Sequence, residues 1–289
     1  MPERTRVVVT GAHSPIGQAV VQRLGSAPDI AVTCVVTPWS RPQGMFPDVA
    51  EVITADLTQA FPETLRRSLA AADRVVHLAW LRYSTPDQAI ALNAETVSRI
   101  TSEMESPGRL IVLSSVGASP GAKSAYGQAK WAVAQQVEAR GGTVLVCGLV
   151  TSDPSFGPYA LLAHTVTRLP VRPRFYWDKV PVYLNPLDGV CGAVLACALR
   201  PMAGGTYRTY PLPATDLNDV LDGFEVNGRF WRPVLPVPTR LLLVFVRLLS
   251  QMRIGPAGLY DKVLTFLYKD NRSYLDTLQP VDSVKYTNK

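Results

Sequence analysis

The fold is decided by one stretch near the start of the chain, Arg6-Val7-Val8-Val9-Thr10-Gly11-Ala12-His13-Ser14-Pro15-Ile16-Gly17. Its first five residues form a short β-branched run without a polar face, which predicts a buried strand. A helical pattern follows over residues 18–24. A turn in this context directs backbone N–H groups and the positive end of a helix towards a pyrophosphate, although an ordinary strand–helix turn is the alternative. The expected dinucleotide-binding residues are Gly11, His13, Ser14, Pro15, Ile16 and Gly17.

Strands and helices alternate from this stretch onwards. The pattern predicts strands at 6–10, 30–36, 51–54, 73–78, 109–114 and 143–149, and helices at 15–26, 61–71, 86–104 and 124–139. Alternation with short connections indicates an α/β fold, a Rossmann-type doubly wound parallel sheet with helices on both faces. The dinucleotide-binding domain is expected over residues 1–150, with returning segments near 180–200.

Beyond residue 150 the pattern becomes irregular and rich in proline. It predicts a smaller, mostly helical C-terminal substrate lobe over residues 151–289, with helices at 188–199, 215–224, 238–252 and 257–268. The apolar segment 235–249 is interrupted by Arg240 and Arg247 and is too short to span a bilayer, which takes about 20 apolar residues. We interpret it as lobe core or part of a dimer surface, rather than as an amphipathic helix in a membrane interface.

A second motif, Ser124-Ala125-Tyr126-Gly127-Gln128-Ala129-Lys130, places a phenol and an ammonium group four residues apart. Positions i and i+4 share one face of a helix, so Lys130 can lie beside the Tyr126 hydroxyl and lower its pKa. Tyr126 could then exchange a proton with a carbonyl or an alcohol, with Ser115 hydrogen-bonding the same oxygen. A chance pairing on a helix is the alternative.

Together these motifs resemble the short-chain dehydrogenase/reductase superfamily, and more closely its extended branch of sugar-nucleotide epimerases, dehydratases and ketoreductases. The first 150 residues match specifically and the remainder loosely. The resemblance implies that Ser115, Tyr126 and Lys130 are catalytic, and that Tyr126 and Lys130 also hold the cofactor. It implies further cofactor contacts from segments that resemble the family's third strand, fourth strand and fourth helix: Asp56, Leu57, Leu78, Ala79, Trp80 and Asn93.

Three departures from the family pattern bear on the substrate. Ser14 stands in place of the glycine that lets the backbone approach the pyrophosphate. Ser115 and Tyr126 are only eleven residues apart, where the extended branch inserts a longer loop that helps to wall the sugar site. Cys147-Gly148 stands where the family has Arg-Pro. Such drift is typical of a ketoreductase or cyclising enzyme that acts on a metabolite other than a sugar.

The end of the second strand bears on the choice of cofactor. NAD-preferring proteins place an acidic residue there, which binds the ribose 2′-hydroxyl. This chain reads Val35-Val36-Thr37-Pro38-Trp39-Ser40-Arg41, with no acid, and Arg41 could meet a 2′-phosphate. NADP(H) is therefore weakly favoured and NAD(H) stays open, with Arg41 as a solvated loop residue in the latter case.

Composition narrows the class of protein and its partners. Apolar residues at 47% and charged residues at 18% indicate a chain with a large core, not a disordered one. The net charge of +6 is modest and mostly scattered, so we expect a small-molecule substrate and no nucleic acid. Arg168, Arg172 and Arg174 are clustered, and could meet a diphosphate or simply be solvated. A homodimer is left open.

The four cysteines show no spacing of a metal site and fall in apolar patterns, where a thiol behaves as a small hydrophobic side chain. No metal is expected. The chain opens with charged residues ahead of a strand and not with an apolar signal segment, so the cytoplasm is the expected compartment.

Two functions remain from these patterns. The first is an NAD(P)-dependent oxidoreductase of the ketoreductase or epimerase type, acting on a carbonyl or secondary alcohol of a sugar nucleotide or secondary metabolite. The second keeps the fold without net redox turnover, as a cyclase, an isomerase or a dinucleotide-sensing regulator. The intact set Ser115, Tyr126 and Lys130 favours the first, whereas Ser14 and the shortened loop favour the second.

Overall fold

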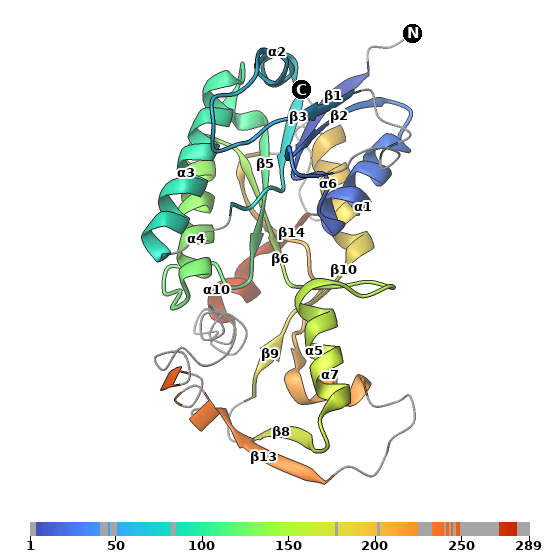
Figure 1. The fold of residues 1–289 in the computed structure, drawn as a ribbon, viewed down its shortest axis with the longest axis vertical. Coiled ribbons are helices and arrows are strands. Elements are labelled where there is room, and N and C mark those ends of the chain that lie inside the picture. Colours follow the sequence, from blue (N-terminus) through green and yellow to red (C-terminus); the bar gives the residue numbers. More distant parts are fainter. Residues whose placement is uncertain are drawn as a thin grey trace.

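The computed structural model describes residues 4–40, 46, 51–81, 85–176, 179–200, 203–224, 233–239, 241–242, 244, 247–248 and 272–281. Its largest unit is an eight-stranded parallel sheet in the order β14-β11-β6-β5-β4-β1-β2-β3 (Figure 1). The strands are β1 (Thr5–Thr10), β2 (Ile30–Val36), β3 (Glu51–Thr54), β4 (Arg74–His77), β5 (Leu110–Ser115), β6 (Thr143–Cys147), β11 (Gly205–Arg208) and β14 (Gln279–Pro280). The predicted doubly wound parallel sheet is confirmed.

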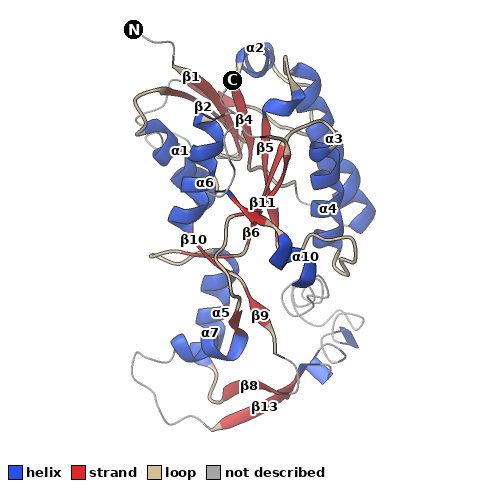
Figure 2. Cartoon of the chain, turned by 180° about the vertical axis from the view of Figure 1, so that it is seen from behind, coloured by secondary structure: helices blue, strands red, loops and turns tan. Residues whose placement is uncertain are grey.

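Helices cover both faces of this sheet (Figures 1 and 2). One face carries α1 (Pro15–Gly25) and α6 (Leu187–Leu199), which pack against each other. The other face carries α2 (Glu63–Ala71), α3 (Pro86–Glu103) and α4 (Ala125–Glu138), and a short 3-10 turn η1 (Pro107–Arg109) precedes β5. Each face has its own apolar core, so the sheet is buried from both sides.

The first strand shows why the apolar run specifies this fold. Val7 and Val9 are 1% and 0% exposed and belong to the core beneath α1 and α6. Val8, which points the other way, is 2% exposed and belongs to the opposite core. A strand buried on both faces needs apolar side chains at every position, as this run provides.

The lobe begins where the chain leaves the sheet after β6. The expected strand over 143–149 is divided at Gly148 into β6 and β7, and a Cβ at Gly148 would lie 2.0 Å from Tyr183 O, so this position requires glycine. Beyond Gly148 the chain leaves the sheet and β7 pairs with β10 instead. The remaining elements are β7 (Leu149–Thr151), α5 (Gly157–Arg168), β8 (Arg172–Tyr176), β9 (Pro181–Val182), β10 (Leu184–Pro186), β12 (Thr215–Asp216), α7 (Leu217–Gly223), β13 (Val234–Pro238) and α10 (Arg272–Thr277).

In its described residues the lobe contains short strands besides its helices. Three two-stranded sheets, β10–β7, β12–β9 and β13–β8, accompany its helices. Proline explains why the patterns here mislead, because it cannot donate to a ladder and is confined to edge strands. Pro173 in β8 and Pro236 in β13 are such edge residues.

Two further segments of the second half return to the main sheet. Strand β11 pairs with β6, and β14 pairs with β11, so residues 205–208 and 279–280 extend the sheet beyond the returning segments expected near 180–200. Leu275 of α10 is fully buried in the core beneath α3 and α4. The larger domain is thus assembled from both ends of the chain.

The apolar segment 235–249 begins as strand β13, and its described residues 239, 241–242, 244 and 247–248 are helical. Leu241, Val244 and Leu248 are 65%, 56% and 52% exposed, so the interpretation as lobe core is wrong for these side chains. Their spacing puts them on one face of a helix, so the alternative interpretation of this segment as a dimer surface stays a prediction. No helix in the described ranges is long and apolar enough to cross a membrane. The helix expected at 257–268 lies outside those ranges.

Candidate active site

The candidate site lies at the carboxyl ends of β1, β4 and β5. The chain runs from β1 through α1 to β2 on one side of β1, whereas β4 lies on its other side. In open α/β sheets, ligands bind in the crevice at this reversal of strand order. Thr10 and His77 end the two strands, and His77 Nδ1 lies 2.7 Å from Thr10 Oγ1.

His77 is neutral in this position. Burial lowers the pKa of its imidazole to about 3, and the nearby charge of Lys130 acts in the same direction. The ring therefore joins two strand ends as an uncharged hydrogen-bonding group and does not exchange protons near neutral pH.

The glycine turn closes against the strand beside it. Gly11 has φ +72°, a conformation that side chains disfavour, and a Cβ there would lie 2.5 Å from Ala79 N. A Cβ on Gly17 would meet Gly11 O at 2.3 Å. Both positions therefore require glycine, which keeps the first turn of α1 next to the end of β4.

Ser14 takes the place of the missing middle glycine by bonding within the turn. Its hydroxyl donates to Gly11 O at 2.9 Å and accepts from Gly17 N at 3.0 Å, so it is the N-cap of α1. Pro15 follows at the first helical position and has no N–H. Two of the donors that a helix N-terminus usually offers to an anion are thus used or absent. His13 Nδ1 is buried beside them and has no hydrogen-bond partner among the described residues.

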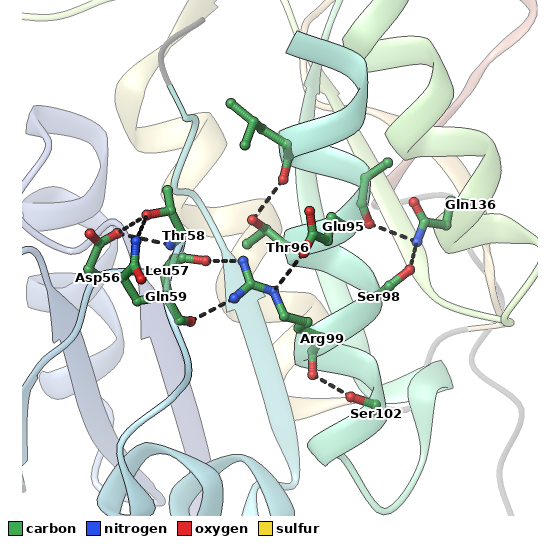
Figure 3. A network of polar contacts seen from close by, with 12 residues as sticks. Asp56, Leu57, Thr58, Gln59, Glu95, Thr96, Ser98, Arg99, Ser102 and Gln136 are labelled. Atoms are coloured by element: carbon green, nitrogen blue, oxygen red, sulfur yellow. Dashed lines mark hydrogen bonds and ion pairs between the residues drawn. The ribbon is translucent and has the colours of Figure 1, made fainter. Parts of the chain in front are cut away.

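The expected adenine-binding segment is fixed by a long-range network (Figure 3). Arg99 of α3 donates to Leu57 O and to Gln59 O, both at 2.6 Å. Asp56 Oδ1 accepts from the N–H and the hydroxyl of Thr58, at 2.9 and 2.8 Å. Arg99 thereby holds the loop after β3 in place, and this brace could not be read from the spacing of Asp56 and Leu57. Their contact with adenine stays a prediction.

The segment after β4 carries an aromatic side chain into the site. Leu78 and Ala79 are half-buried and follow His77, and the Trp80 ring packs edge-to-face on Tyr126 with 5.5 Å between ring centroids. Asn93 Oδ1 accepts from Leu81 N at 3.0 Å, and its amide donates to Ala89 O at 2.9 Å. Asn93 is 1% exposed, so it braces the chain beside Trp80, and its expected contact with a cofactor stays a prediction.

Lys130 and Tyr126 come from the first turns of α4, whose N-cap is Ser124. The Lys130 ammonium donates to Leu113 O of β5 at 2.8 Å and lies 4.0 Å from the centre of the Trp80 ring and 5.9 Å from that of Tyr126. Burial lowers the pKa of Lys130 to about 8, with Cys147 acting in the opposite direction. The predicted i, i+4 pair is thus brought to the same edge of the sheet as the glycine turn.

Ser115 ends β5, and its Oγ accepts from Gly117 N at 3.2 Å. Its neighbour Ser114 is buried on the other face, with no hydrogen-bond partner for its hydroxyl among the described residues. Because successive residues of a strand face opposite sides, only one of the pair can share a side with Tyr126.

The remaining predicted residues lie elsewhere. Arg41 is outside the described residues. Arg172 and Arg174 of β8 both bond to Asp222 of α7, with nitrogen–oxygen distances of 2.9 and 2.8 Å, in the part of the lobe farthest from the sheet (Figure 1). Arg168 contacts His164 on its own helix. A role for the three in binding a diphosphate stays a prediction.

Sequence reasoning missed one cluster at the point where the chain leaves β6. Thr209 Oγ1 lies 2.6 Å from Asn185 Oδ1 and 3.4 Å from Cys147 Sγ, and Gly148 N donates to Asn185 Oδ1 at 3.2 Å. The departure at Cys147-Gly148 from the family pattern was the signal for it. Burial raises the pKa of Cys147 to about 11, so the thiol stays protonated. All four cysteines are buried, as expected.

No group of three or more metal-ligating side chains occurs in the parts of the chain that the structure describes. The site therefore consists of a glycine turn, an aromatic wall and a lysine–tyrosine pair. Such a set can hold an anionic ligand, stack against a planar group and move a proton at one oxygen.

No protein-family model and no curated protein matches the chain. Solved structures do match its fold. The UDP-glucose 4-epimerase of Thermotoga maritima, determined with UDP-glucose, is 19% identical with a TM-score of 0.63, and the match covers 93% of this chain and 99% of that one. The UDP-glucuronic acid 4-epimerase of Bacillus cereus in complex with NAD is 14% identical with a TM-score of 0.62, and the match covers 93% of this chain and 99% of that one.

A third match is the terminal R domain from the myxalamid PKS-NRPS biosynthetic pathway, 17% identical with a TM-score of 0.64, over 93% of this chain and 80% of that one. At these identities the likeness shows the fold. The chain has the Rossmann-type fold of sugar-nucleotide epimerases and of this R domain.

Proposed function

We propose that the chain is an NAD(P)-dependent oxidoreductase of the extended short-chain dehydrogenase/reductase branch, of the ketoreductase or epimerase type. Its substrate would carry a carbonyl or secondary alcohol on a sugar nucleotide or a secondary metabolite. One observation carries the proposal: the glycine turn and the lysine–tyrosine pair are linked by a continuous set of contacts. Gly11 lies against Ala79, and the next residue, Trp80, contacts both Lys130 and Tyr126. This set joins a turn suited to phosphate to a pair suited to proton transfer.

The residues present fit a dinucleotide in most respects. Gly11 and Gly17 leave the turn free of side chains, and α1 begins beside it with its positive end. The end of β2 carries no carboxylate: Ser40 Oγ donates to Thr37 O at 2.6 Å and closes a turn. An NADP(H) preference is therefore proposed, with Arg41 as the residue that meets the 2′-phosphate.

The chemistry divides between the cofactor and the side chains. A nicotinamide cofactor, when bound, supplies or accepts the hydride. Tyr126 donates a proton to the oxygen of the carbonyl, or takes one from the alcohol in the reverse direction. The Lys130 charge favours the phenolate form of Tyr126, and Ser115 orients the reacting oxygen by a hydrogen bond.

Calorimetric titration with NADPH, NADP, NADH and NAD tests the first half of the proposal. We expect binding of at least one dinucleotide. No measurable binding of any of the four at millimolar concentration would contradict the proposed enzyme function. Arg41→Ala should weaken NADPH by about 1–3 kcal/mol, the scale of a charge-assisted hydrogen bond, and leave NADH nearly unchanged. Equal losses for both would show that Arg41 does not read the 2′-phosphate.

Three substitutions test the second half once a substrate is found. Tyr126→Phe should lower the rate by about 10²–10⁴ while the fold and cofactor binding persist. Ser115→Ala should cost about 10²–10³, the scale of a lost oxyanion donor, and Lys130→Met should be the most severe. Full activity in Tyr126→Phe would locate the chemistry elsewhere.

A protein without net redox turnover is the second candidate, and the bonding of Ser14 favours it. The Ser14 hydroxyl occupies Gly17 N, and Pro15 has no N–H, so fewer donors are left for a pyrophosphate. The two candidates differ in cofactor absorbance, since an oxidoreductase consumes the reduced cofactor with the substrate. A substrate deuterated at the reacting carbon separates an internal hydride transfer, as in an epimerase, from chemistry without a hydride.

A further inference from the structure

Lys130 is held from two sides by groups that carry no negative charge. Its ammonium donates to Leu113 O at 2.8 Å and lies 4.0 Å from the centre of the Trp80 ring. No carboxylate among the described residues forms an ion pair with it, although it is only 9% exposed. A buried cation without a counter-ion needs another source of stabilisation, and the face of an indole is the strongest that an aromatic side chain offers.

The other titratable groups around Lys130 do not replace a counter-ion. His77 of β4 is neutral at physiological pH, and Cys147 of β6 keeps its proton because burial raises its pKa to about 11. Tyr126 lies on the same helix with its ring centre 5.9 Å from Lys130 Nζ. Apart from the opposing effect of Cys147 on the pKa of Lys130, the groups that favour its charged form are Leu113 O and the face of the Trp80 ring.

Trp80 is itself fixed in place for this contact. Its ring packs edge-to-face on Tyr126 at 5.5 Å between centroids, and the next residue, Leu81, is bonded through its N–H to Asn93. Its own Nε1 is buried and has no hydrogen-bond partner among the described residues. The ring is thus held by packing and by its backbone, and it presents its face to the ammonium.

We propose that Trp80 is a positioning residue for the reaction proposed above, because its ring holds the Lys130 ammonium beside Tyr126 in the charged form. The catalytic effect of Trp80 rests on the proposed function, whereas the contact between Trp80 and Lys130 is independent of any substrate. Without the ring, Lys130 loses a group that favours its charge, and its pKa falls below the value of about 8. Neutral Lys130 cannot favour the phenolate of Tyr126.

The test is the pKa of Lys130, measured by carbon NMR on protein labelled at the lysine ε-carbon and assigned with Lys130→Arg. Trp80→Leu should lower this pKa by about 0.5–1.5 units, the scale of a partly desolvated cation–π contact. Trp80→Phe keeps a weaker aromatic face and should lower it by less. An unchanged or raised pKa in Trp80→Leu would overturn the proposal.

Trp131 offers a matched control one residue beyond Lys130. Its ring also packs edge-to-face on a tyrosine, Tyr274, at 5.6 Å between centroids, on a different side of α4. Trp131→Leu should remove a similar aromatic contact and leave the pKa of Lys130 unchanged. If it lowers that pKa as much as Trp80→Leu does, the effect is general loosening of α4 and the proposal fails.

A measurement on the unsubstituted protein guards against variants that do not fold. The indole N–H resonance of Trp80 should titrate with the same pKa as Lys130, and this titration should vanish in Lys130→Met. A Trp80 resonance that stays constant between pH 6 and 10 would contradict the contact, irrespective of any variant.

Dinucleotide titration separates this proposal from the proposed function. If the wild-type protein binds no dinucleotide while the pKa of Lys130 responds to Trp80, the proposed function fails and the contact stands. If it binds one, Trp80→Leu should weaken binding about 3- to 30-fold, because Lys130 is displaced. The fall of the reaction rate at high pH, which reports loss of the Lys130 proton, should then move to lower pH. Tighter binding in Trp80→Leu would show that the ring obstructs the site, which overturns the positioning role.

Discussion

Thr10 and His77 join the ends of the two central strands through a hydrogen bond of 2.7 Å between Oγ1 and Nδ1. The imidazole is uncharged at neutral pH, because burial, and after it the nearby charge of Lys130, lower its pKa. With a pKa of about 3, His77 joins the ends of β1 and β4 as an uncharged group at neutral pH.

Acid should destabilise the protein through His77. Its pKa is about 3 in the fold and about 6.5 in an unfolded chain, so the unfolded state binds the extra proton between these values. The free energy of unfolding should fall as the pH drops from 6.5 towards 3, by at most about 1.4 kcal/mol per pH unit from this group. In urea titrations at several pH values, the difference in free energy of unfolding between wild type and His77→Gln should become smaller at low pH.

Gly11→Ala should damage both stability and dinucleotide binding. The new Cβ would lie 2.5 Å from Ala79 N in a backbone with φ +72°. We expect a loss of about 2–4 kcal/mol in the free energy of unfolding from the clash and the strained dihedral. Gly121→Ala is the matched control, since nothing lies within 4 Å of its added Cβ. Equal unfolding midpoints for the two variants would refute this account of the turn.

Ser14→Gly should strengthen dinucleotide binding. The change releases Gly17 N from the Ser14 hydroxyl and removes a side chain from the turn. One freed donor is worth about 0.5–1.5 kcal/mol, or roughly 2- to 12-fold in affinity, and glycine costs only a few tenths of a kcal/mol as an N-cap. Ser14→Ala frees the same N–H but keeps a Cβ, so it separates the two effects. Calorimetry that finds weaker binding in Ser14→Gly would contradict the prediction.

Lys130→Met should have a higher free energy of unfolding than wild type, although we expect it to lose the proposed activity. The pKa of Lys130 is about 8 in the fold and about 10.4 in an unfolded chain, so burial of the charge destabilises the fold fully below pH 8. We expect a gain of about 1–3 kcal/mol at pH 7, which disappears as the pH rises from 8 towards 10.4. Denaturation at pH 7 and pH 10 measures it, and a loss of stability at pH 7 would show that the lysine bonds outweigh its desolvation.

Local patterns were sufficient for the elements that build the sheet. The strands expected at 30–36 and 51–54 coincide with Ile30–Val36 and Glu51–Thr54, because each is a short segment rich in β-branched residues. Helices expected at 15–26 and 124–139 begin at Pro15 and Ala125, where Ser14 and Ser124 are N-caps. In these cases the chain carries the signal within a few neighbouring residues.

The lobe depended on pairings that local patterns do not contain. Strand β8 pairs with β13, so Arg172 faces Val234 across about sixty residues of sequence. Helix α5 (Gly157–Arg168) was missed because prolines at 154 and 158 suggested irregular chain, although Pro158 stands in its first turn, where proline is tolerated.

The candidate site was predictable in its parts and not in its contacts. The glycine turn and the Tyr126–Lys130 pair follow from spacing alone. The position of Trp80 over Lys130 joins residues fifty positions apart, and the brace from Arg99 to Leu57 joins residues forty-two positions apart. Such contacts depend on how α3 and α4 pack, which periodicity does not specify.

Strand β14 has a consequence for how the chain is made. It covers β11 through two residue pairs, Tyr207 with Gln279 and Arg208 with Pro280, which lie about seventy residues apart. At about 5–20 residues per second, a ribosome would need roughly 4–14 s after making β11 to make this cover. For that time the nascent sheet displays an unpaired edge that other chains can join. We expect the yield of native protein in cells to depend on chaperones that hold the growing chain until strand β14 has been made.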